Sequence, residues 1–328
     1  WTIKEIGLNF TKKYIEHIKL KGLSVNQIKD QIELFISGIT FVHIVEAANL
    51  NSGILSLSKT EMQHYIDLFD KEKNDVDLTK FVPASGAATR MFKFLFQFLE
   101  NYNTKKESIN SYINRNKDAD LSLFFVGMEK LPFYNDVVKE LRSSVDHYES
   151  LSSNEKRLLF VKEMLDEDKL NLSFLPKGLF PFHKYKDHVA TAFEEHLFEA
   201  ALYASSNDQA KLHFTITKKH NKKFESEYKR IEEIVEKKTK TNFEIEFSYQ
   251  KESTDTIAVN SKNEPFRNTD GSLLFRPSGH GALIENLNAL DTDVVFIKNI
   301  DNVVVYKYEE EVAQYKKMLA GILLDLQE

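Results

Sequence analysis

The chain has 328 residues, enough to bury a large core in one domain or in two smaller ones. Lys and Arg number 44 against 50 Asp and Glu, so the net charge of -6 gives no bulk attraction to nucleic acid or to anionic membranes. The absence of cysteine excludes disulfides, thiolate catalysis and cysteine–zinc sites. No apolar run is long enough to span a bilayer, and residues 1–10 lack a signal-type apolar block. We therefore expect a cytoplasmic protein that binds neither nucleic acid nor membrane.

The predicted elements begin, in chain order, with helices. Apolar residues recur at helical spacing over residues 1–78, and Ser58 with Glu61 has the pattern of a capping box. The charged stretch from about 101 to 170 is also predicted to be helical, and we interpret it as an insertion. We therefore predict an N-terminal helical region at 1–78 and an α/β domain at 79–328.

Several short runs rich in β-branched or aromatic residues predict strands. These runs are 80–82, 211–217, 243–249 and 294–297. Helical patterns over 192–205 and 224–237 separate most of them, and this alternation predicts a mostly parallel sheet flanked by helices. A predicted hairpin turn at Asn268-Thr269-Asp270-Gly271 adds a small antiparallel part, which makes the predicted sheet mixed.

A run of very small residues follows the first predicted strand and leads into a predicted helix. Its sequence is Ala84-Ser85-Gly86-Ala87-Ala88-Thr89-Arg90. Small side chains let a phosphate approach backbone N–H groups, and Arg90 adds a positive charge with several donors. A tightly packed turn from strand to helix explains the same run about equally well.

Lys177 lies in a segment that prolines and a glycine make stiff, Pro176-Lys177-Gly178 followed by Pro181. A rigidly presented ammonium group suits a phosphate that gains charge during a reaction. The alternative interpretation is a solvated lysine in a Pro-Gly turn.

Two further loops carry polar groups near predicted strand or helix ends. Glycines flank His280 in Gly279-His280-Gly281, so a ligand can approach the backbone closely, although a capping histidine is the commoner role. Asp301 follows the strand 294–297, where a carboxylate could hold Mg²⁺; an ordinary Asn/Asp turn is the alternative.

Histidines and glutamates also gather near residue 190. They are His183, His188, His196, Glu194, Glu195 and Glu199. A metal cluster is conceivable, but the spacing does not match His-Glu-x-x-His. We therefore favour a solvated helix face for this charged run.

Together the motifs supply a phosphate cradle, two cations and a metal carboxylate. This inventory fits phosphoryl or nucleotidyl transfer, in which catalysis rests on positioning and charge neutralisation. The P-loop signature and the Gly-x-Gly-x-x-Gly fingerprint are both absent from the sequence.

At this level the motifs resemble a known superfamily. Residues 84–91 resemble the glycine-rich Gly-Gly-x-Gly-Thr-Arg-Leu/Met loop of sugar nucleotidyltransferases, and Pro176-Lys177 resembles their lysine motif. Gln250, Gly279-His280-Gly281 and the turn 299–302 are similar to elements of the UDP-sugar pyrophosphorylase branch. The stretch 81–302 also resembles an uncharacterised bacterial family, a domain of unknown function grouped with those enzymes.

The resemblance implies a GT-A-like, Rossmann-related fold and attack of a sugar 1-phosphate on the α-phosphorus of a nucleoside triphosphate, most simply UTP. By carry-over, the small-residue loop holds the triphosphate, while Arg90 and Lys177 neutralise charge at the transferring phosphorus. Gln250 would face the base, and the Gly279-His280-Gly281 loop would contact nucleotide or sugar. Asp301 would hold Mg²⁺.

The sequence also departs from the pattern of that superfamily. Ser85 and Ala88 replace two loop glycines, and the enzymes of this branch continue well beyond the position where this chain stops. A catalytically degenerate nucleotide-binding or regulatory protein is therefore one alternative. A glycosyltransferase is another, because Asp291-Thr292-Asp293 has the Asp-x-Asp pattern, although it precedes a strand rather than ending one.

Overall fold

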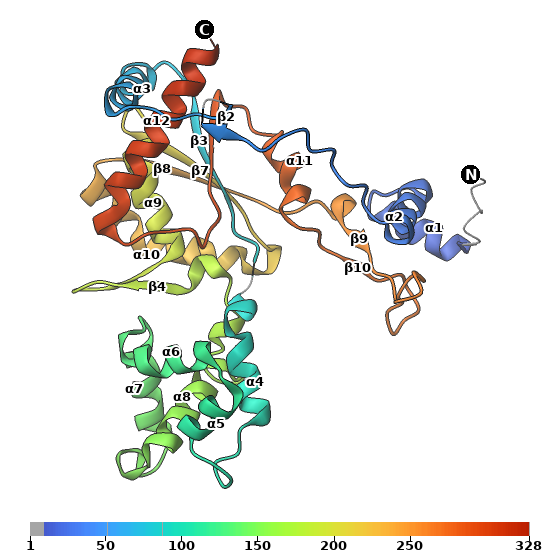
Figure 1. Cartoon of the computed structure of the whole chain (residues 1–328), viewed down its shortest axis with the longest axis vertical. Helices are drawn as coiled ribbons and strands as arrows, with labels where there is room; N and C mark the ends of the chain where they lie inside the picture. The colour runs from blue at the N-terminus through green and yellow to red at the C-terminus, as the bar shows by residue number, and fades with distance from the viewer. Residues whose placement is uncertain (1–9, 51, 87, 328) are drawn as a thin grey trace. The chain divides into compact units, whose positions relative to one another are not determined.

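The computed structural model describes residues 10–50, 52–86 and 88–327. Its internal contacts divide the chain into two units, each assembled from two stretches of sequence. The small unit comprises the residues up to His64 together with Ser248–Asp291, and the large unit comprises Tyr65–Phe247 with the residues from Thr292 onward. Figure 1 shows the elements in chain order. The sequence pattern alone does not indicate this discontinuous division.

The small unit is built on two helices, α1 (Lys12–Leu20) and α2 (Val25–Ser37). Their buried isoleucines pack with Ile257 and Leu273 from the second stretch of sequence. The predicted turn at Asn268 is confirmed, because the Gly271 N–H donates to the Asn268 carbonyl at 2.9 Å and Gly271 has φ +79°. The other elements of the small unit are β1 (Asn49–Leu50), β2 (Gly53–Ile54), β9 (Thr256–Ile257), β10 (Phe275–Arg276), α11 (Ile284–Leu287) and 3₁₀ helices at Glu252–Thr254 and His280–Leu283.

Helix α3 (Lys59–Glu72) begins with the predicted capping box. The Ser58 N–H donates to the Glu61 carboxylate at 2.7 Å, and the Glu61 N–H donates to Ser58 Oγ at 3.3 Å. These two bonds satisfy backbone N–H groups that the first turn of a helix leaves without partners.

The large unit contains a mixed five-stranded sheet. Strand β3 (Leu78–Pro83) lies between β11 (Val294–Ile297) and β7 (Gln209–Thr215), and it is parallel to both. Strand β6 (Ser205–Ser206) returns antiparallel to β7, and β8 (Asn242–Ser248) also pairs with β7. The predicted mixed α/β class is thus confirmed.

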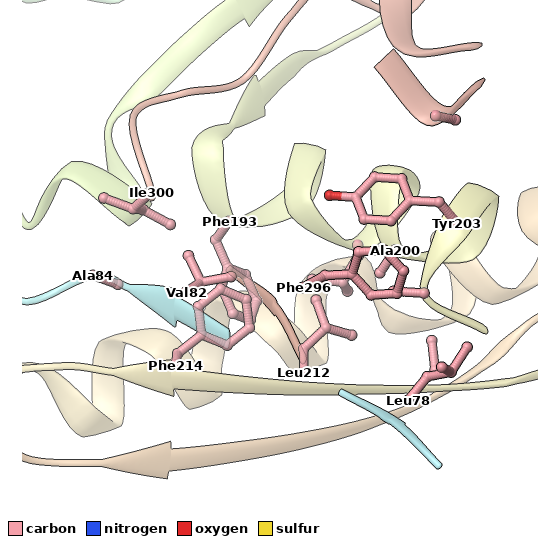
Figure 2. Packing of buried hydrophobic residues seen from close by; sticks show 14 of the residues in the cluster. Leu78, Val82, Ala84, Phe193, Ala200, Tyr203, Leu212, Phe214, Phe296 and Ile300 are labelled. Carbon is pink, nitrogen blue, oxygen red and sulfur yellow. The ribbon is translucent and has the colours of Figure 1, made fainter. Parts of the chain in front are cut away.

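Helices cover this sheet through a large apolar core. They are α9 (Ala192–Tyr203), α10 (Asn221–Thr239) and α12 (Glu309–Gln327). All six residues of β3 are buried, as expected of a central strand in a covered parallel sheet. Figure 2 shows Val82 and Phe214 of the strands packed with Phe193 of α9.

The residues predicted to form a helical insertion are helical and have a core of their own. The helices there are α5 (Ile109–Asn116), α6 (Ala119–Gly127), α7 (Tyr134–Ser144) and α8 (Ser153–Leu165). Helix α4 (Lys93–Asn101), which precedes them, packs into the same core. Shorter elements of the large unit are β4 (Pro181–Lys184), β5 (Val189–Thr191) and 3₁₀ helices at Ala88–Phe92, Met128–Lys130, Tyr148–Ser150, Leu172–Phe174, Lys177–Leu179, Lys218–His220 and Tyr306–Tyr308. None of the described helices has the length and apolar character needed to cross a membrane.

Candidate functional site

The carboxyl ends of β11, β3 and β7 meet at one edge of the sheet, since the three strands are parallel. The chain runs from β3 to β7 on one side of β3 and later places β11 on the other side. In open α/β sheets, ligands bind beyond the carboxyl ends of strands at such a reversal of strand order. The Ile300 N–H donates to the Pro83 carbonyl at 3.2 Å, which fixes the turn after β11 against the end of β3.

Lys177, Asp301 and the Gly86 loop come together at this edge. Lys177 Nζ lies 2.5 Å from Asp301 Oδ2, and the Lys177 N–H donates to the Gly86 carbonyl at 3.0 Å. Both side chains stay partly exposed, at 23% for Lys177 and 38% for Asp301. The structure therefore brings together three segments that are far apart in the sequence, since almost a hundred residues separate even the nearest two.

Gly178 explains why this lysine turn needs a glycine. A Cβ atom there would lie 2.7 Å from the ring of Phe224 and 3.3 Å from Ile300 Cδ1. Contacts this close to a ring carbon force a neighbour to move. Gly178 thus lets the Lys177 turn pack directly on Ile300, the residue before Asp301.

The small residues of the loop divide into buried and exposed positions. Ala84 and Ala88 are fully buried, and their N–H groups donate to the carbonyls of Thr215 and Leu175, at 2.8 and 3.2 Å. Their amides are therefore occupied by the fold, as the tight-turn interpretation requires. Ser85 and Gly86 are exposed, Thr89 is half-buried, and Ala87 lies outside the described residues.

Arg90 is exposed and lies in the 3₁₀ helix 88–92, which separates the loop from α4. The helix predicted after the loop is present as α4, and this 3₁₀ turn leads into it. Arg90 lines a cavity of about 800 Å³ together with residues of α4 and α6, such as Phe94 and Leu123. Among the described residues, the lining of this cavity includes neither Lys177 nor Asp301.

Gln250 and the Gly279-His280-Gly281 loop belong to the small unit. The Gln250 side-chain amide donates to Thr254 Oγ1 at 3.1 Å, and Ser278 Oγ donates to the Thr254 carbonyl at 2.8 Å. Thr254 thus connects Gln250 to the residue that precedes the glycines. Gly279, His280 and Gly281 are exposed, and a Cβ added at either glycine would meet no atom within 4 Å.

The expectation of a solvated face on the helix near residue 190 is wrong. In α9, Glu194 is 2% exposed and Glu195 1%, while His196 and Glu199 are fully buried. A buried charged group requires a polar or oppositely charged partner, because the free energy lost when it leaves water is far larger than the gain from apolar contacts. The partners come from β3 and the turn after β11, from β4 and the turn that follows it, and from α10.

Glu199 holds two buried lysines. Its carboxylate lies 3.1 Å from Lys80 Nζ of β3 and 2.6 Å from Lys298 Nζ after β11, and it accepts a hydrogen bond from the Tyr203 hydroxyl at 3.1 Å. Burial alone would raise the pKa of Glu199, but the charges of the two lysines outweigh it and lower this pKa to about 2. Burial lowers the pKa of Lys80 to about 8, against the pull of the carboxylate.

His196 connects this buried network to the candidate site. Its Nε2 lies 3.2 Å from the Ile300 carbonyl, one residue before Asp301. Burial, followed by the charge of Lys80, lowers the pKa of His196 well below its usual value. A neutral His196 donating from Nε2 therefore fixes the carbonyl that precedes Asp301.

A metal cluster formed by these histidines and glutamates finds no support. Over the described ranges, no group of three or more His, Asp or Glu side chains is arranged to hold a metal ion. His183 Nδ1 instead contacts Glu195 at 2.7 Å, and His188 Nε2 lies 3.1 Å from Glu194.

Comparison with known proteins identifies a family but no characterised relative. No curated protein and no solved structure matches the chain. Residues 11–328 match a family described as a domain of unknown function, DUF4301. The chain, matched over nearly its whole length, therefore belongs to the DUF4301 family.

Proposed function

We propose that this protein is a nucleotidyltransferase that transfers a nucleoside monophosphate, preferably UMP, to a sugar 1-phosphate with release of pyrophosphate. The observation that carries the proposal is the Lys177–Asp301 pair at the carboxyl edge of β3 and β11, joined through the Lys177 N–H to the Gly86 loop. The resemblance of the loop and lysine motifs to sugar nucleotidyltransferases supports the same reaction.

The chemistry of this edge suits a phosphate chain. Ser85 and Gly86 are exposed, the Gly86 carbonyl accepts from the Lys177 backbone N–H, and a Cβ atom added at Gly86 would meet no atom within 4 Å. Asp301 holds the Lys177 ammonium group in place, so this group can neutralise negative charge that develops on phosphate oxygens during transfer. Under this proposal, the sugar 1-phosphate attacks the α-phosphorus, and the bond to pyrophosphate breaks.

The resemblance of the motifs assigns the remaining predicted residues to the nucleotide and the sugar. Arg90 would neutralise charge at the transferring phosphorus. Gln250 and the Gly279–Gly281 loop belong to the small unit, and their predicted contacts with base and sugar form no part of the proposed edge site. Each assignment rests on the resemblance of the motifs and calls for its own variant.

Asp301 supplies a single carboxylate whose Oδ2 already accepts from the Lys177 ammonium group, so it would fit Mg²⁺ only together with the phosphates of the nucleotide and with Lys177 bonded to those phosphates instead. This is the usual condition for an ion that keeps several waters and binds through one or two carboxylates. When bound there, Mg²⁺ would act as a Lewis acid on phosphate oxygens.

The test combines binding and turnover. We would titrate the protein with UTP and Mg²⁺ by calorimetry, and measure pyrophosphate release with a panel of sugar 1-phosphates. Lys177→Ala and Asp301→Asn should each weaken UTP binding at least tenfold, whereas Lys139→Ala, a change at an exposed lysine of α7, should leave it unchanged. The absence of UTP binding by the wild-type protein would refute the proposal.

A second candidate is a nucleotide-binding protein without turnover. The occupied amides of Ala84 and Ala88 favour it, since they leave fewer loop N–H groups for a triphosphate. Binding of UTP without pyrophosphate release by any sugar 1-phosphate would select this candidate.

A glycosyltransferase finds no such support in the Asp-x-Asp motif. The Asp293 carboxylate accepts a hydrogen bond from the Asp77 N–H at 2.8 Å, and Thr292 Oγ1 donates to the Asp77 carbonyl at 2.8 Å. Both bonds hold the amino end of β11, at the opposite end of the strand from Asp301.

A further inference from the structure

A second cavity of the large unit lies beside α9, apart from the Lys177–Asp301 edge. Its volume is about 1020 Å³, and its walls come from the turn between β4 and β5, α9, the end of α10 and the beginning of α12. Phe198, Ala201 and Leu202 of α9 supply apolar wall, and Tyr185 and Tyr306 supply aromatic rings. Glu195 and Glu309 line the same cavity although they are only 1% and 5% exposed.

Hydrogen bonds hold one of these two carboxyl groups in place. Glu195 Oε1 accepts a hydrogen bond from the Tyr185 hydroxyl at 2.7 Å and lies 2.7 Å from His183 Nδ1. The Tyr185 hydroxyl in turn accepts from the Tyr306 N–H at 3.1 Å. Tyrosine, histidine and backbone therefore hold Glu195 in one orientation toward Glu309.

Glu309 is left incomplete. Its Oε1 is buried and has no hydrogen-bond partner among the described residues. A buried oxygen without a donor is unfavourable, and this one lies at the wall of an open cavity. A ligand that brings N–H donors into the cavity would remove this cost.

We propose that this cavity binds a small aliphatic amine, whose ammonium group donates to Glu309 and is neutralised by the Glu195–Glu309 pair. The apolar wall of α9 suits the methylene groups of such a ligand, and the tyrosine rings suit its charge. This cavity is separate from the Lys177–Asp301 edge, so amine binding there does not depend on nucleotidyl transfer.

Protonation of the pair supports this chemistry. Burial, the neighbouring charge of Glu195 and a hydrogen bond between the two carboxyl groups raise the pKa of Glu309 to about 8, so at neutral pH Glu309 keeps its proton. An ammonium ion that binds there displaces the proton. Amine binding must therefore release close to one proton at pH 7 and tighten as the pH rises.

Other charges surround the pair on every side. The buried charged groups are Glu194 and Glu199 of α9, Lys80 of β3 and Lys298 after β11, and the titratable His183 and Tyr185 from the β4 side are half-buried. The rim carries Lys186, Asp187 and His188 from the β4–β5 turn, Lys238 of α10, and Lys307 and Glu310 at the start of α12. The three rim lysines are exposed, so solvent and salt screen them more than they screen the buried carboxyl pair.

The experiment is a calorimetric titration of the full chain with putrescine and with butylamine, at about pH 6.5 and about pH 8.5, in two buffers of different ionisation enthalpy. Competition with a proton at the Glu309 pKa predicts about a 20-fold gain in affinity over this range. The two buffers report the released proton directly, so this readout requires no variant.

Glu309→Gln tests the residue, because glutamine has the shape of the protonated acid and should preserve the fold, which circular dichroism checks. This variant should bind the amine at least tenfold more weakly at about pH 8.5 and lose the pH dependence. Glu311→Gln, an exposed change in the same helical turn, is the control and should bind the amine as the wild type does. The pKa of Lys80 is also about 8, and this control variant retains Lys80.

Three outcomes would overturn the proposal. They are no amine binding by the wild type at about pH 8.5, equal binding by Glu309→Gln, and binding without proton release. Sorbitol, a polyol without charge, serves as the competing probe. Binding of sorbitol but not of butylamine would assign the cavity to a polyol instead.

Discussion

Replacement of Glu199 by glutamine tests how the buried charges hold the large unit together. The carboxylate is the one acceptor shared by the Lys80 ammonium at 3.1 Å, the Lys298 ammonium at 2.6 Å and the Tyr203 hydroxyl at 3.1 Å. Lys80 is fully buried and Lys298 is 7% exposed, so Glu199→Gln removes the nearest counter-charge of two confined cations.

The expected loss is about 3–5 kcal/mol in the free energy of unfolding, the usual cost of removing one partner from a buried ion pair. We would measure it by urea denaturation followed by far-UV circular dichroism, and compare free energies only if the denaturant slope stays unchanged. Glu233→Gln, at an exposed position of α10, is the control and should cost less than about 0.5 kcal/mol.

The pH dependence of the loss provides a second reading. In the wild type the pKa of Lys80 is about 8, and without Glu199 it falls further. Between the Lys80 pKa of the folded variant and about pH 8, the unfolded variant binds more protons than the folded variant. The free energy of unfolding of the variant therefore rises with pH in this range, whereas Lys80 gives the wild type no such gain. The difference in free energy of unfolding between the two proteins should therefore narrow from about pH 6 to about pH 8. A loss under about 1 kcal/mol at pH 7, or a pH-independent loss, would refute the reasoning.

Three further predictions concern packing and protonation. Gly321→Ala should destabilise the protein by more than about 2 kcal/mol, because its methyl group would overlap the carbonyl oxygen of Tyr65 where α12 packs on α3; thermal denaturation measures this. Gly178→Ala should cost about 1–3 kcal/mol in the same assay and weaken UTP binding, because the new methyl group pushes on the ring that supports the lysine turn. Wild-type stability should fall below pH 4.5 as Glu199 becomes protonated, and it should fall again between about 6.5 and 8, where folded Glu309 keeps a proton that the unfolded chain has lost. Between pH 4.5 and 6.5 the Glu309 decline is offset by His196, which is neutral in the folded protein while the unfolded chain binds a proton there. Glu309→Gln should flatten the second decline, which has a limiting slope of about 1.4 kcal/mol per pH unit, in urea titrations across this range.

Gly127→Ala is the matched control for both glycine variants, because a Cβ atom there meets nothing within 4 Å and the backbone φ is ordinary. A comparable loss in this control would remove the steric explanation. An unchanged pH profile for Glu309→Gln would likewise show that Glu309 titrates normally in the folded protein.

The strands and the edge of the sheet could be predicted because the signal is local. β-branched and aromatic residues indicate β3 and β11 directly, and parallel pairing then carries the residues after each strand to one edge. This is why Asp301 could be expected beside the Gly86 loop, whereas Lys177, which follows none of these strands, was assigned to the same site by the resemblance of its motif. The occupied amides of Ala84 and Ala88 could not be predicted, since their acceptors belong to segments distant in sequence.

The buried face of α9 was missed for the same reason. Read alone, Glu194-Glu195-His196 is a charged run, and charged runs usually face solvent. The available signal lay elsewhere: Lys80 and Lys298 each adjoin apolar strand residues, where a lysine must be buried and paired. Matching such cations with glutamates on an otherwise apolar helix would have pointed to Glu199.

The position of β3 has a consequence for synthesis of the chain. Asp77, at the start of this strand, is bonded to Asp293, a residue 216 positions later. One edge of a wholly buried strand therefore stays unpaired on the ribosome until translation has passed β11, long after β7 has covered the other edge. Pairing over so long a span slows folding, and a nascent apolar edge is open to association with other chains. Truncation before residue 294 would make that transient hazard permanent, so shortened forms should depend on chaperones or aggregate.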